Sequence, residues 1–415
     1  MSRIALMFPG QGSQYVGMCK DLYDEHLIVR KTFDEAKDVL GIDLKKLCFD
    51  SDIKELTKTS NAQIALLTVS IAMFRLFMEY APIQPYCLVG HSLGEISALT
   101  CAGAIKFPDA LRIVRKRGQL MQEISESGCG IMAAISNIDA QLIRECLENN
   151  KYDSGVAELA CNNSYKQNVI SGEERLVKSI CSELENKGAN IKYLNVSGPF
   201  HSKLMESAAI KFEEELKLYS YNDLRWPVIS NVNAKRYNNK NNIIRNLRKQ
   251  LISPVLWADI MEALDKDNVD MCIELGPKKT LKNLLNQSVK GIQIYSFDHI
   301  EDREYLLNEL VNEYNAETFV KKCLSISICT ENNNWNSNEY DNYVVKSINR
   351  IIELYNACKV EKVNKYDVMK ESLDLLRCVL YNKKLSINEQ INRINSLKRY
   401  TIDSNMLNQI NTEGE

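Results

Sequence analysis

The stretch PYCLVGHSLGEISALTCAG, residues 85–103, sets a short apolar run directly before Gly90-His91-Ser92-Leu93-Gly94 and an apolar, helix-compatible run after it. Gly-x-Ser-x-Gly between a strand and a helix is typical of a nucleophile elbow, a turn so sharp that side chains at Gly90 and Gly94 would collide with their neighbours. Such a turn sets the Ser92 hydroxyl at the N-terminus of the next helix, where free N–H groups help to hold developing negative charge. A Gly-rich turn that contains serine by chance is the alternative.

Composition limits the classes to which the chain can belong. Its 415 residues suffice for two or three structural units, and its formal net charge of −2 argues against nucleic-acid binding. The 13 cysteines are odd in number, scattered and without CxxC spacing, so we expect free thiols and a cytoplasmic location. No signal peptide is expected. The apolar run at residues 62–74 is too short to span a membrane and runs into Arg75, so we predict a buried core helix, with bounds at residues 61–79.

Alternating apolar strands and helices predict an α/β fold with a mainly parallel sheet that is covered on both faces. The expected strands are residues 3–8, 86–89, 226–230, 271–275 and 292–297. The loop FPGQGSQ at 8–14 leaves the first strand. Its glycines allow the backbone N–H of Gln11 to approach the elbow as a second oxyanion donor, although a plain Gly-rich turn is an equally simple interpretation.

A different pattern occupies residues 129–198. Strands and helices are expected there in the order β-α-β-β-α-β, at residues 131–135, 139–149, 156–161, 167–171, 173–187 and 190–196. This order is the ferredoxin-like split motif. We therefore predict a small ferredoxin-like subdomain inserted into a larger α/β unit that is made of residues 1–128 and 199–300.

A catalytic serine needs a neighbouring base, and the chain has four histidines from which to choose. His26 lies in a charged helix, and His299 lies in an acidic stretch at the end of a late strand. His91 is next to Ser92 in sequence, but its side chain should point away from that hydroxyl. His201 lies in a Gly-Pro loop where the inserted subdomain returns to the larger unit. By exclusion His201 is the expected base, with a purely structural histidine as the alternative.

The helix that Pro108 begins carries four basic residues, Arg112, Arg115, Lys116 and Arg117. Most such residues are solvated. At least one of them is able to turn inward and bind a carboxylate, because the guanidinium fork offers two parallel hydrogen bonds.

Residues 301–415 are expected to form an all-helical extension, because apolar residues recur there at helical spacing. Ser386 and Glu389 form a capping-box signature. The Asn-rich connection 330–338 has Trp335 as its one apolar residue, which we expect to anchor it. No titratable cluster in the extension resembles a site, so docking or scaffolding is the expected role.

Five motifs of the chain occur together and in order. They are FPGQGSQ at 8–14, GHSLGE at 90–95, RKRGQLM at 115–121, GPFHS at 198–202 and QLISPVLW at 250–257. Over residues 1–300 this combination resembles the malonyl-CoA:acyl-carrier-protein transacylases. The resemblance implies an α/β-hydrolase-like large subdomain with the ferredoxin-like insertion.

The resemblance also implies roles for particular residues. Ser92 would be the nucleophile and His201 its base. Gln250 would orient His201 through its backbone carbonyl, so that a Ser-His dyad replaces a triad. Backbone N–H groups of Gln11 and Leu93 would form the oxyanion hole.

The acyl group would be held by three further residues. Arg117 would bind the malonyl carboxylate bidentately, and Met121 and Phe200 would line the pocket. The bulk of Phe200 would favour malonyl over methylmalonyl.

The implied reaction is ping-pong transfer of malonyl from malonyl-CoA, through a malonyl-Ser92 ester, to the phosphopantetheine thiol of an acyl carrier protein in fatty acid or polyketide biosynthesis. An acidic carrier protein is the implied partner. Lys278, Lys279 and Lys282 are possible contacts for it or ordinary surface lysines. No metal, no redox cofactor, no nucleic acid and no membrane are implied, and CoA enters only as part of the substrate.

The extension, especially residues 320–335, resembles the one attached to discrete, trans-acting acyltransferases of polyketide assembly lines. Three other interpretations stay open. An acyl hydrolase acting on carrier proteins would lack the arginine at 117. A non-catalytic scaffold would not need the catalytic set. A general esterase would need the order Ser–acid–His, without the ferredoxin-like insertion.

Overall fold

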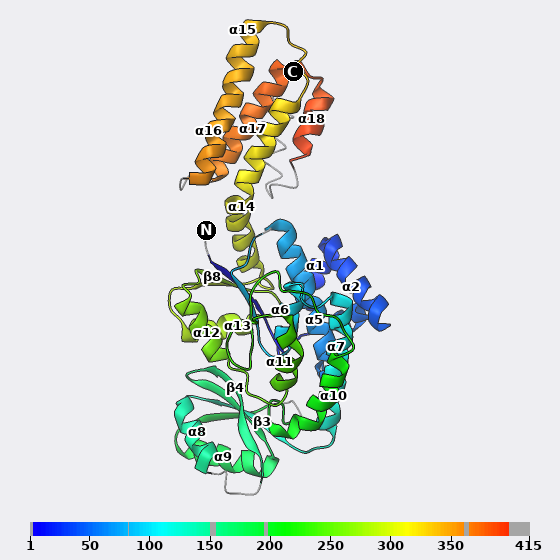
Figure 1. The fold of residues 1–415 in the computed structure, drawn as a ribbon, viewed down its shortest axis with the longest axis vertical. Helices are drawn as coiled ribbons and strands as arrows, with labels where there is room; N and C mark the ends of the chain where they lie inside the picture. The colour runs from blue at the N-terminus through cyan, green and yellow to red at the C-terminus, as the bar shows by residue number, and fades with distance from the viewer. Residues whose placement is uncertain (1–2, 82, 150–154, 195–197, 361–364, 398–415) are drawn as a thin grey trace. The chain divides into compact units, whose positions relative to one another are not determined.

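The computed structural model describes residues 3–81, 83–149, 155–194, 198–360 and 365–397 (Figure 1). Its contacts divide the chain into two compact units, one of residues 1–76 and 84–303 and the other of residues 77–83 and 304–415. The sequence analysis assigned residues 77–83 to the first unit. They group with the second unit, and the first four of them form the end of helix α5, Thr59–Tyr80.

A five-stranded parallel sheet forms the centre of the first unit. Its strands lie in the order β7-β2-β1-β8-β9, with bounds β1 Ile4–Phe8, β2 Cys87–Gly90, β7 Val228–Ile229, β8 Met271–Glu274 and β9 Gln293–Ser296. Every residue of β1, β2 and β8 is buried, as a sheet covered on both faces requires. The predicted α/β fold with a parallel sheet is confirmed. Parallel strands end at one edge, so the loops after β1, β2, β7 and β8 meet there.

The helices of the first unit outside the inserted subdomain pack around the parallel sheet. They are α1 Lys20–Glu25, α2 Leu27–Leu40, α3 Leu44–Phe49, α4 Ile53–Thr57, α5, α6 Leu93–Cys101, α7 Phe107–Glu126, α10 Glu206–Leu216, α11 Ile243–Gln250, α12 Trp257–Lys266 and α13 Thr280–Ser288. Two short 3₁₀ turns lie at Lys203–Met205 and Lys240–Asn242.

Helix α5 confirms the buried helix predicted at residues 61–79. It has 22 residues, and by length and composition alone it is the one described helix that is able to cross a membrane. Arg75 lies within it, and its guanidinium donates to Thr32 Oγ1 at 3.1 Å and to Glu35 Oε2 at 2.7 Å. Most of its apolar stretch, 78%, is buried inside the protein, which is typical of a core helix.

The inserted subdomain is a four-stranded antiparallel sheet in the order β4-β5-β3-β6. Its elements are β3 Ile131–Ser136, α8 Ala140–Asn149, β4 Ala157–Ser164, β5 Gln167–Gly172, α9 Glu174–Asn186 and β6 Asn190–Tyr193. This is the ferredoxin-like topology. Strand β6 ends earlier than predicted, and residues 195 and 196 of the predicted strand lie outside the described residues. Strand β4 is tied to the large subdomain where Asn162 N–H donates to Val255 O at 2.9 Å.

The second unit is helical, as expected. Its helices are α14 Ile300–Cys329, α15 Ser337–Glu339, a π-helical turn Tyr340–Val345, α16 Lys346–Val360, α17 Lys365–Asn382 and α18 Ile387–Asn395. Apolar residues of α14, α16, α17 and α18 share one core. Half of the predicted capping box is confirmed, because Ser386 Oγ accepts from Glu389 N at 3.4 Å. The Glu389 carboxylate accepts from Ser386 Oγ at 3.1 Å and not from the backbone N–H of Ser386.

The expectation for Trp335 was wrong. Its side chain is 90% exposed and anchors nothing in the described part of the unit. Asn334 is the buried residue of this connection, and its amide donates to Asn382 O at 2.8 Å. Lys383 lies beside it, with its buried ammonium donating to Ser327 O and Thr330 O at the end of α14. The connection is therefore held by amide and ammonium groups and not by an apolar anchor.

The sharp turn after β2 depends on two glycines. A Cβ at Gly90 would lie 2.0 Å from Gly94 O, and a Cβ at Gly94 would lie 2.0 Å from Phe8 O. Real carbon–oxygen contacts do not approach so closely. The helix after the elbow therefore packs directly on the end of β1, which brings the loop after β1 beside Ser92.

We predict that Gly94→Ala lowers the free energy of unfolding by about 3 kcal/mol or more, because the backbone of β1 has to move. Gly103→Ala is the matched control. That glycine has φ +79° and no atom within 4 Å of its would-be Cβ, so it should lose roughly 1–2 kcal/mol from backbone strain alone. Urea unfolding followed by circular dichroism measures both, and equal losses would contradict the close-approach argument.

Candidate active site

Ser92 occupies the turn between β2 and α6, where it is the N-cap residue of the helix. Its φ of 52° and ψ of −106° lie outside the regions that residues with a side chain normally adopt. Such a conformation costs about 1–3 kcal/mol and persists only when its surroundings enforce it. The elbow predicted from Gly-x-Ser-x-Gly is therefore present in the structure, with the serine at a helix N-terminus.

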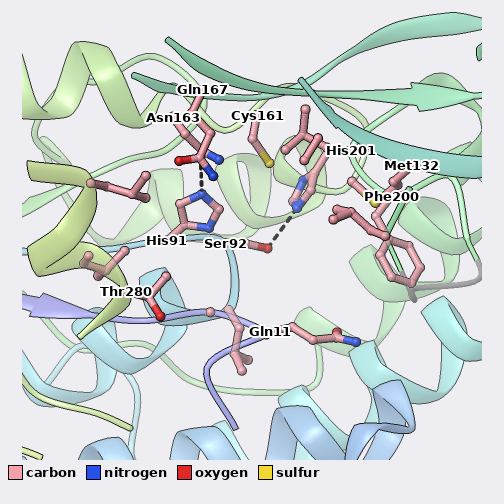
Figure 2. A pocket seen from close by; sticks show the side chains of 18 of the residues that line it. Gln11, His91, Ser92, Met132, Cys161, Asn163, Gln167, Phe200, His201 and Thr280 are labelled. Carbon is pink, nitrogen blue, oxygen red and sulfur yellow. Dashed lines mark hydrogen bonds between the residues drawn. The ribbon is translucent and has the colours of Figure 1, made fainter. Parts of the chain in front are cut away.

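The Ser92 hydroxyl faces His201, with Oγ and Nε2 2.9 Å apart (Figure 2). The other ring nitrogen of His201, Nδ1, lies 2.7 Å from the backbone oxygen of Gln250. A carbonyl only accepts hydrogen bonds, so Nδ1 carries the proton and Nε2 presents its lone pair to the hydroxyl. This is the tautomer that a general base for Ser92 requires.

The surroundings of His201 keep its imidazole neutral. The side chain is buried, and the Arg117 guanidinium lies close to it. Burial first, and then the charge of Arg117, lower the pKa of His201 to about 3, while the hydrogen bond to Gln250 opposes the shift. The base is therefore unprotonated throughout the physiological pH range.

Arg117 is the one of the four basic residues on α7 that turns fully inward, and it is 1% exposed. Its Nη2 donates to Ser92 Oγ and to Gln250 Oε1, both at 3.0 Å, and its Nη1 donates to Gln63 Oε1 at 2.9 Å. Burial lowers the pKa of Arg117 to about 10, so the group remains a cation at neutral pH. Its Nε is buried and has no hydrogen-bond partner among the described residues.

A pocket of about 630 Å³ opens above these residues, between the large sheet and the ferredoxin-like sheet. In Figure 2, Met132 and Phe200 lie on the His201 side, and Asn163, Gln167 and Thr280 lie beyond His91. The lining includes seven of the eight predicted site residues, Gln11, Ser92, Leu93, Arg117, Met121, Phe200 and His201. Gln250 lies behind the nucleophile, where it contacts His201 and Arg117.

Two backbone N–H groups border the pocket beside Ser92. They belong to Gln11, in the loop after β1, and to Leu93, the first residue of α6. Neither donates a hydrogen bond within the described residues. Ser92 N–H, by contrast, is occupied, because it donates to Asn231 Oδ1 at 2.7 Å. An oxyanion that forms next to Ser92 can therefore accept from Gln11 and Leu93.

Sequence reasoning missed three residues of this site. Gln63 binds Arg117, but it lies in α5, whose sequence predicted only a buried core helix and no site. Asn231 follows β7, and its place at the carboxyl end of a parallel strand was the signal that it belongs here. Glu95 lies in the elbow motif itself and accepts from Gln250 Nε2 at 2.6 Å.

The expectation for His91 was half right. Its Nε2 bonds Asn163 Oδ1 at 2.8 Å and not Ser92, but its ring lines the same pocket (Figure 2). Among the three lysines considered for a carrier protein, Lys282 is half-buried in an ion pair with Asp302 at 2.5 Å. Lys278 donates to Gly12 O at 3.3 Å, and Lys279 is exposed.

The sequence matches the family model described as "Acyl transferase domain" over residues 6–334. The chain belongs to the acyl transferase family. One relative, a malonyl CoA-acyl carrier protein transacylase of Bacillus subtilis, is 38% identical over 94% of this chain and 99% of its own length. Another transacylase of the same name, from Bacillus subtilis strain 168, is 43% identical but covers only 72% of this chain and 96% of its own.

Solved structures of acyl transferases agree with this membership. The transacylase of Coxiella burnetii has a TM-score of 0.72 at 34% identity, covering 74% of this chain and 98% of its own. A malonyl-transacylase solved in complex with its type II polyketide synthase acyl-carrier protein has a TM-score of 0.72 at 35% identity. The match covers 74% of this chain and 100% of that chain. The first relative thus matches 94% of this chain, a larger share than the 72% that the strain 168 relative matches.

We predict that acylation of Ser92 by p-nitrophenyl acetate, a donor without a carboxylate, keeps its rate from pH 8 down to about pH 5. A histidine with an ordinary pKa near 6.5 would lose its base form over this range, whereas His201, at about 3, does not. Burst kinetics with stopped-flow absorbance measures the rate.

Arg117→Met supplies the comparison for this pH profile. Without the neighbouring cation the pKa of His201 rises, so the acid limb should move upward by about 1 unit. A wild-type rate that halves near pH 6.5, or an Arg117→Met profile that moves to lower pH, would contradict the assignment.

Proposed function

We propose that the protein is an acyl-carrier-protein S-malonyltransferase, which moves a malonyl group from malonyl-CoA to the phosphopantetheine thiol of an acyl carrier protein. The observation that carries the proposal is the buried cation of Arg117, which is hydrogen-bonded to the nucleophile at 3.0 Å. Within the described residues Arg117 forms no salt bridge. The buried carboxylate of Glu95 acts on Arg117 without forming a salt bridge, and an acyl group that ends in a carboxylate supplies a negative charge in direct contact.

In the first half of the reaction His201 Nε2 takes the proton of Ser92 Oγ, and Oγ attacks the thioester carbon of malonyl-CoA. The carbonyl oxygen becomes an oxyanion that accepts from the N–H groups of Gln11 and Leu93. The carbon–sulfur bond then breaks, the CoA sulfur takes the proton from His201, and malonyl-Ser92 remains. In the second half the pantetheine thiol of the carrier protein gives its proton to His201 and its sulfur attacks the ester carbon. The bond from that carbon to Ser92 Oγ then breaks, and His201 Nε2 returns the proton to Oγ.

The carboxylate of the malonyl group fits Arg117 in a specific way. The unpartnered Nε–H and one Nη2–H lie on the same side of a guanidinium, so together they form a bidentate fork. In the free enzyme that Nη2 donates to Ser92 Oγ. Once Oγ is part of an ester it is a weaker acceptor, and the fork becomes available. Met121 and the buried ring of Phe200 border the same space, which favours an unbranched acyl group.

This arrangement also discriminates between the open alternatives. A hydrolase of neutral acyl chains has no use for an unpaired buried cation, whose desolvation is costly. A non-catalytic scaffold has no use for the strained Ser92 or for the bond between its hydroxyl and a neutral imidazole.

We propose further that the acceptor is a carrier protein of a polyketide assembly line, and that the enzyme acts in trans in the cytoplasm. The extension supports this, since residues 320–335 resemble that of discrete polyketide acyltransferases and one relative is similar over 94% of the chain. All 13 cysteines are free thiols, which supports a reducing compartment.

We predict that radiolabelled malonyl-CoA labels the wild-type protein, and that the label passes to an added carrier protein. Ser92→Ala should take no label. Arg117→Ala should be acylated by malonyl-CoA roughly 100-fold more slowly, which corresponds to the loss of two charge-assisted hydrogen bonds. The rate of acylation by acetyl-CoA, divided by the rate with malonyl-CoA, should increase in this variant. Release of free malonate without transfer, or equal labelling by acetyl-CoA in the wild type, would establish the hydrolase instead.

The choice of acceptor is tested separately. Malonyl-Ser92 is mixed with equal amounts of a fatty acid carrier protein and a polyketide carrier protein, and the label on each is followed by mass spectrometry. We expect transfer to the polyketide carrier to be at least about tenfold faster, equivalent to 1.4 kcal/mol. Equal rates, or a preference for the fatty acid carrier, would refute the polyketide assignment while leaving malonyl transfer intact.

A further inference from the structure

A buried carboxylate lies directly beneath the nucleophile. Glu95, on the first turn of α6, is 0% exposed. Its Oε2 accepts from Gln250 Nε2 at 2.6 Å and from the backbone N–H of Asn231 at 3.1 Å. Its Oε1 accepts from the Tyr237 hydroxyl at 2.5 Å. Within the described residues Glu95 forms no salt bridge, so these three hydrogen bonds have to offset the cost of burying its carboxylate.

The two residues that bind Oε2 also hold the backbone of Ser92. Gln250 Nε2 donates to Ser92 O at 3.0 Å. Asn231 Oδ1 accepts from Ser92 N–H at 2.7 Å, and Asn231 Nδ2 donates to Gly90 O, also at 2.7 Å. The amide side chains of Asn231 and Gln250 thus fix both peptide groups of the strained residue. Glu95 Oε2 binds the side chain of Gln250 and the backbone N–H of Asn231.

Through Gln250, Glu95 Oε2 is also linked to Arg117 and His201. The side-chain oxygen of Gln250 accepts from Arg117 Nη2 at 3.0 Å, and its backbone oxygen faces His201 Nδ1 at 2.7 Å. A rotation of the Gln250 side chain would release Ser92 O and the Arg117 guanidinium together. The bond to Glu95 Oε2 opposes that rotation.

We propose that Glu95 is a positioning residue for the acyl transfer. Through its Oε2 it orients Asn231 and Gln250, and these hold the Ser92 backbone in the conformation that presents Oγ to His201. Oε2 has to be an acceptor, because both groups that face it are N–H donors. The inference rests on the proposed function only in taking Ser92 as the nucleophile.

The test compares Glu95→Met with Glu95→Gln. Methionine fills a similar volume but offers no strong acceptor, so Asn231 N–H and one hydrogen of Gln250 Nε2 lose their partner. Glutamine can place its oxygen at the Oε2 position and turn its amide toward the Tyr237 hydroxyl, which is able to accept. We expect Ser92 to react about 100-fold more slowly in Glu95→Met and less than tenfold more slowly in Glu95→Gln.

The readout is covalent labelling by an alkyl fluorophosphonate. In that step Ser92 Oγ forms a bond to phosphorus, fluoride leaves, and His201 Nε2 takes the proton. The probe contains neither malonate nor CoA, so its rate reports the position of the nucleophile even if malonyl transfer were refuted. Rates are expressed per folded molecule, with the folded fraction measured by circular dichroism.

Tyr237→Phe separates positioning from stability. It removes a buried hydrogen bond to Glu95 Oε1, so the melting temperature should fall. Because Oε1 does not bind Asn231 or Gln250, the labelling rate should stay within about threefold of the wild type. Glu95→Met labelling at the wild-type rate would overturn the proposal. So would a loss in Tyr237→Phe as large as the one in Glu95→Met.

A double-variant cycle covers the case in which Glu95→Met does not fold. Gln250→Met keeps the backbone carbonyl that faces His201 but removes the amide that links Glu95 to Ser92 O. If Glu95 acts through this amide, Gln250→Met slows labelling at least about 30-fold, and adding Glu95→Gln to it slows labelling by no more than a further twofold. If the slowing in the double variant equals the product of the slowing in Gln250→Met and the slowing in Glu95→Gln, the two residues act independently and the proposal is overturned.

Discussion

The contact between Gly94 and the end of β1 is the constraint on which the active site depends. Because a Cβ at Gly94 would lie 2.0 Å from Phe8 O, helix α6 can pack onto the sheet only with its first turn pressed against that strand. This packing forces Ser92 into its unusual φ and ψ and brings the loop that contains Gln11 next to the start of α6. The nucleophile and both N–H groups beside it are therefore consequences of one close backbone approach.

The electrostatics of the pocket follow from burying a cation beside a base. Arg117 lowers the pKa of His201 through its charge, and within the described residues no carboxylate forms a salt bridge with it. A substrate carboxylate on Arg117 would cancel much of that charge, so the basicity of His201 should increase when an anionic acyl group arrives. In this arrangement the same side chain selects the substrate and adjusts the base that activates the serine.

Local sterics explain what the sequence predicted well. Gly90 and Gly94 favoured a nucleophile elbow over a chance Gly-rich turn, because a side chain at either position would collide with its neighbours. The alternation of apolar strands with helices predicted the parallel sheet, and the separate β-α-β-β-α-β order predicted the second sheet. The assignment of His201 needed only a short list of histidines. The roles proposed for Arg117 and Gln250 came from the family resemblance, because nothing in the spacing of basic or amide residues shows which of them turns inward.

Other features depend on contacts that no local pattern encodes. Glu95 meets Asn231 and Gln250 across separations of 136 and 155 residues, so their hydrogen bonds became visible only with the fold. Trp335 was expected to be an anchor because apolar residues are usually buried, but an apolar residue is not obliged to be inside.

The strand order has a consequence for how the chain folds as it is synthesised. Strand β1 pairs with β2 on one side and with β8 on the other, and roughly 180 residues separate the end of β2 from the start of β8. At a translation rate of 5–20 residues per second, one hydrogen-bonding edge of this wholly apolar strand stays unpaired for roughly 10–35 s. A nascent chain with an open β-edge for that long is a substrate for chaperones, and the acyl pocket closes only after most of the chain has left the ribosome.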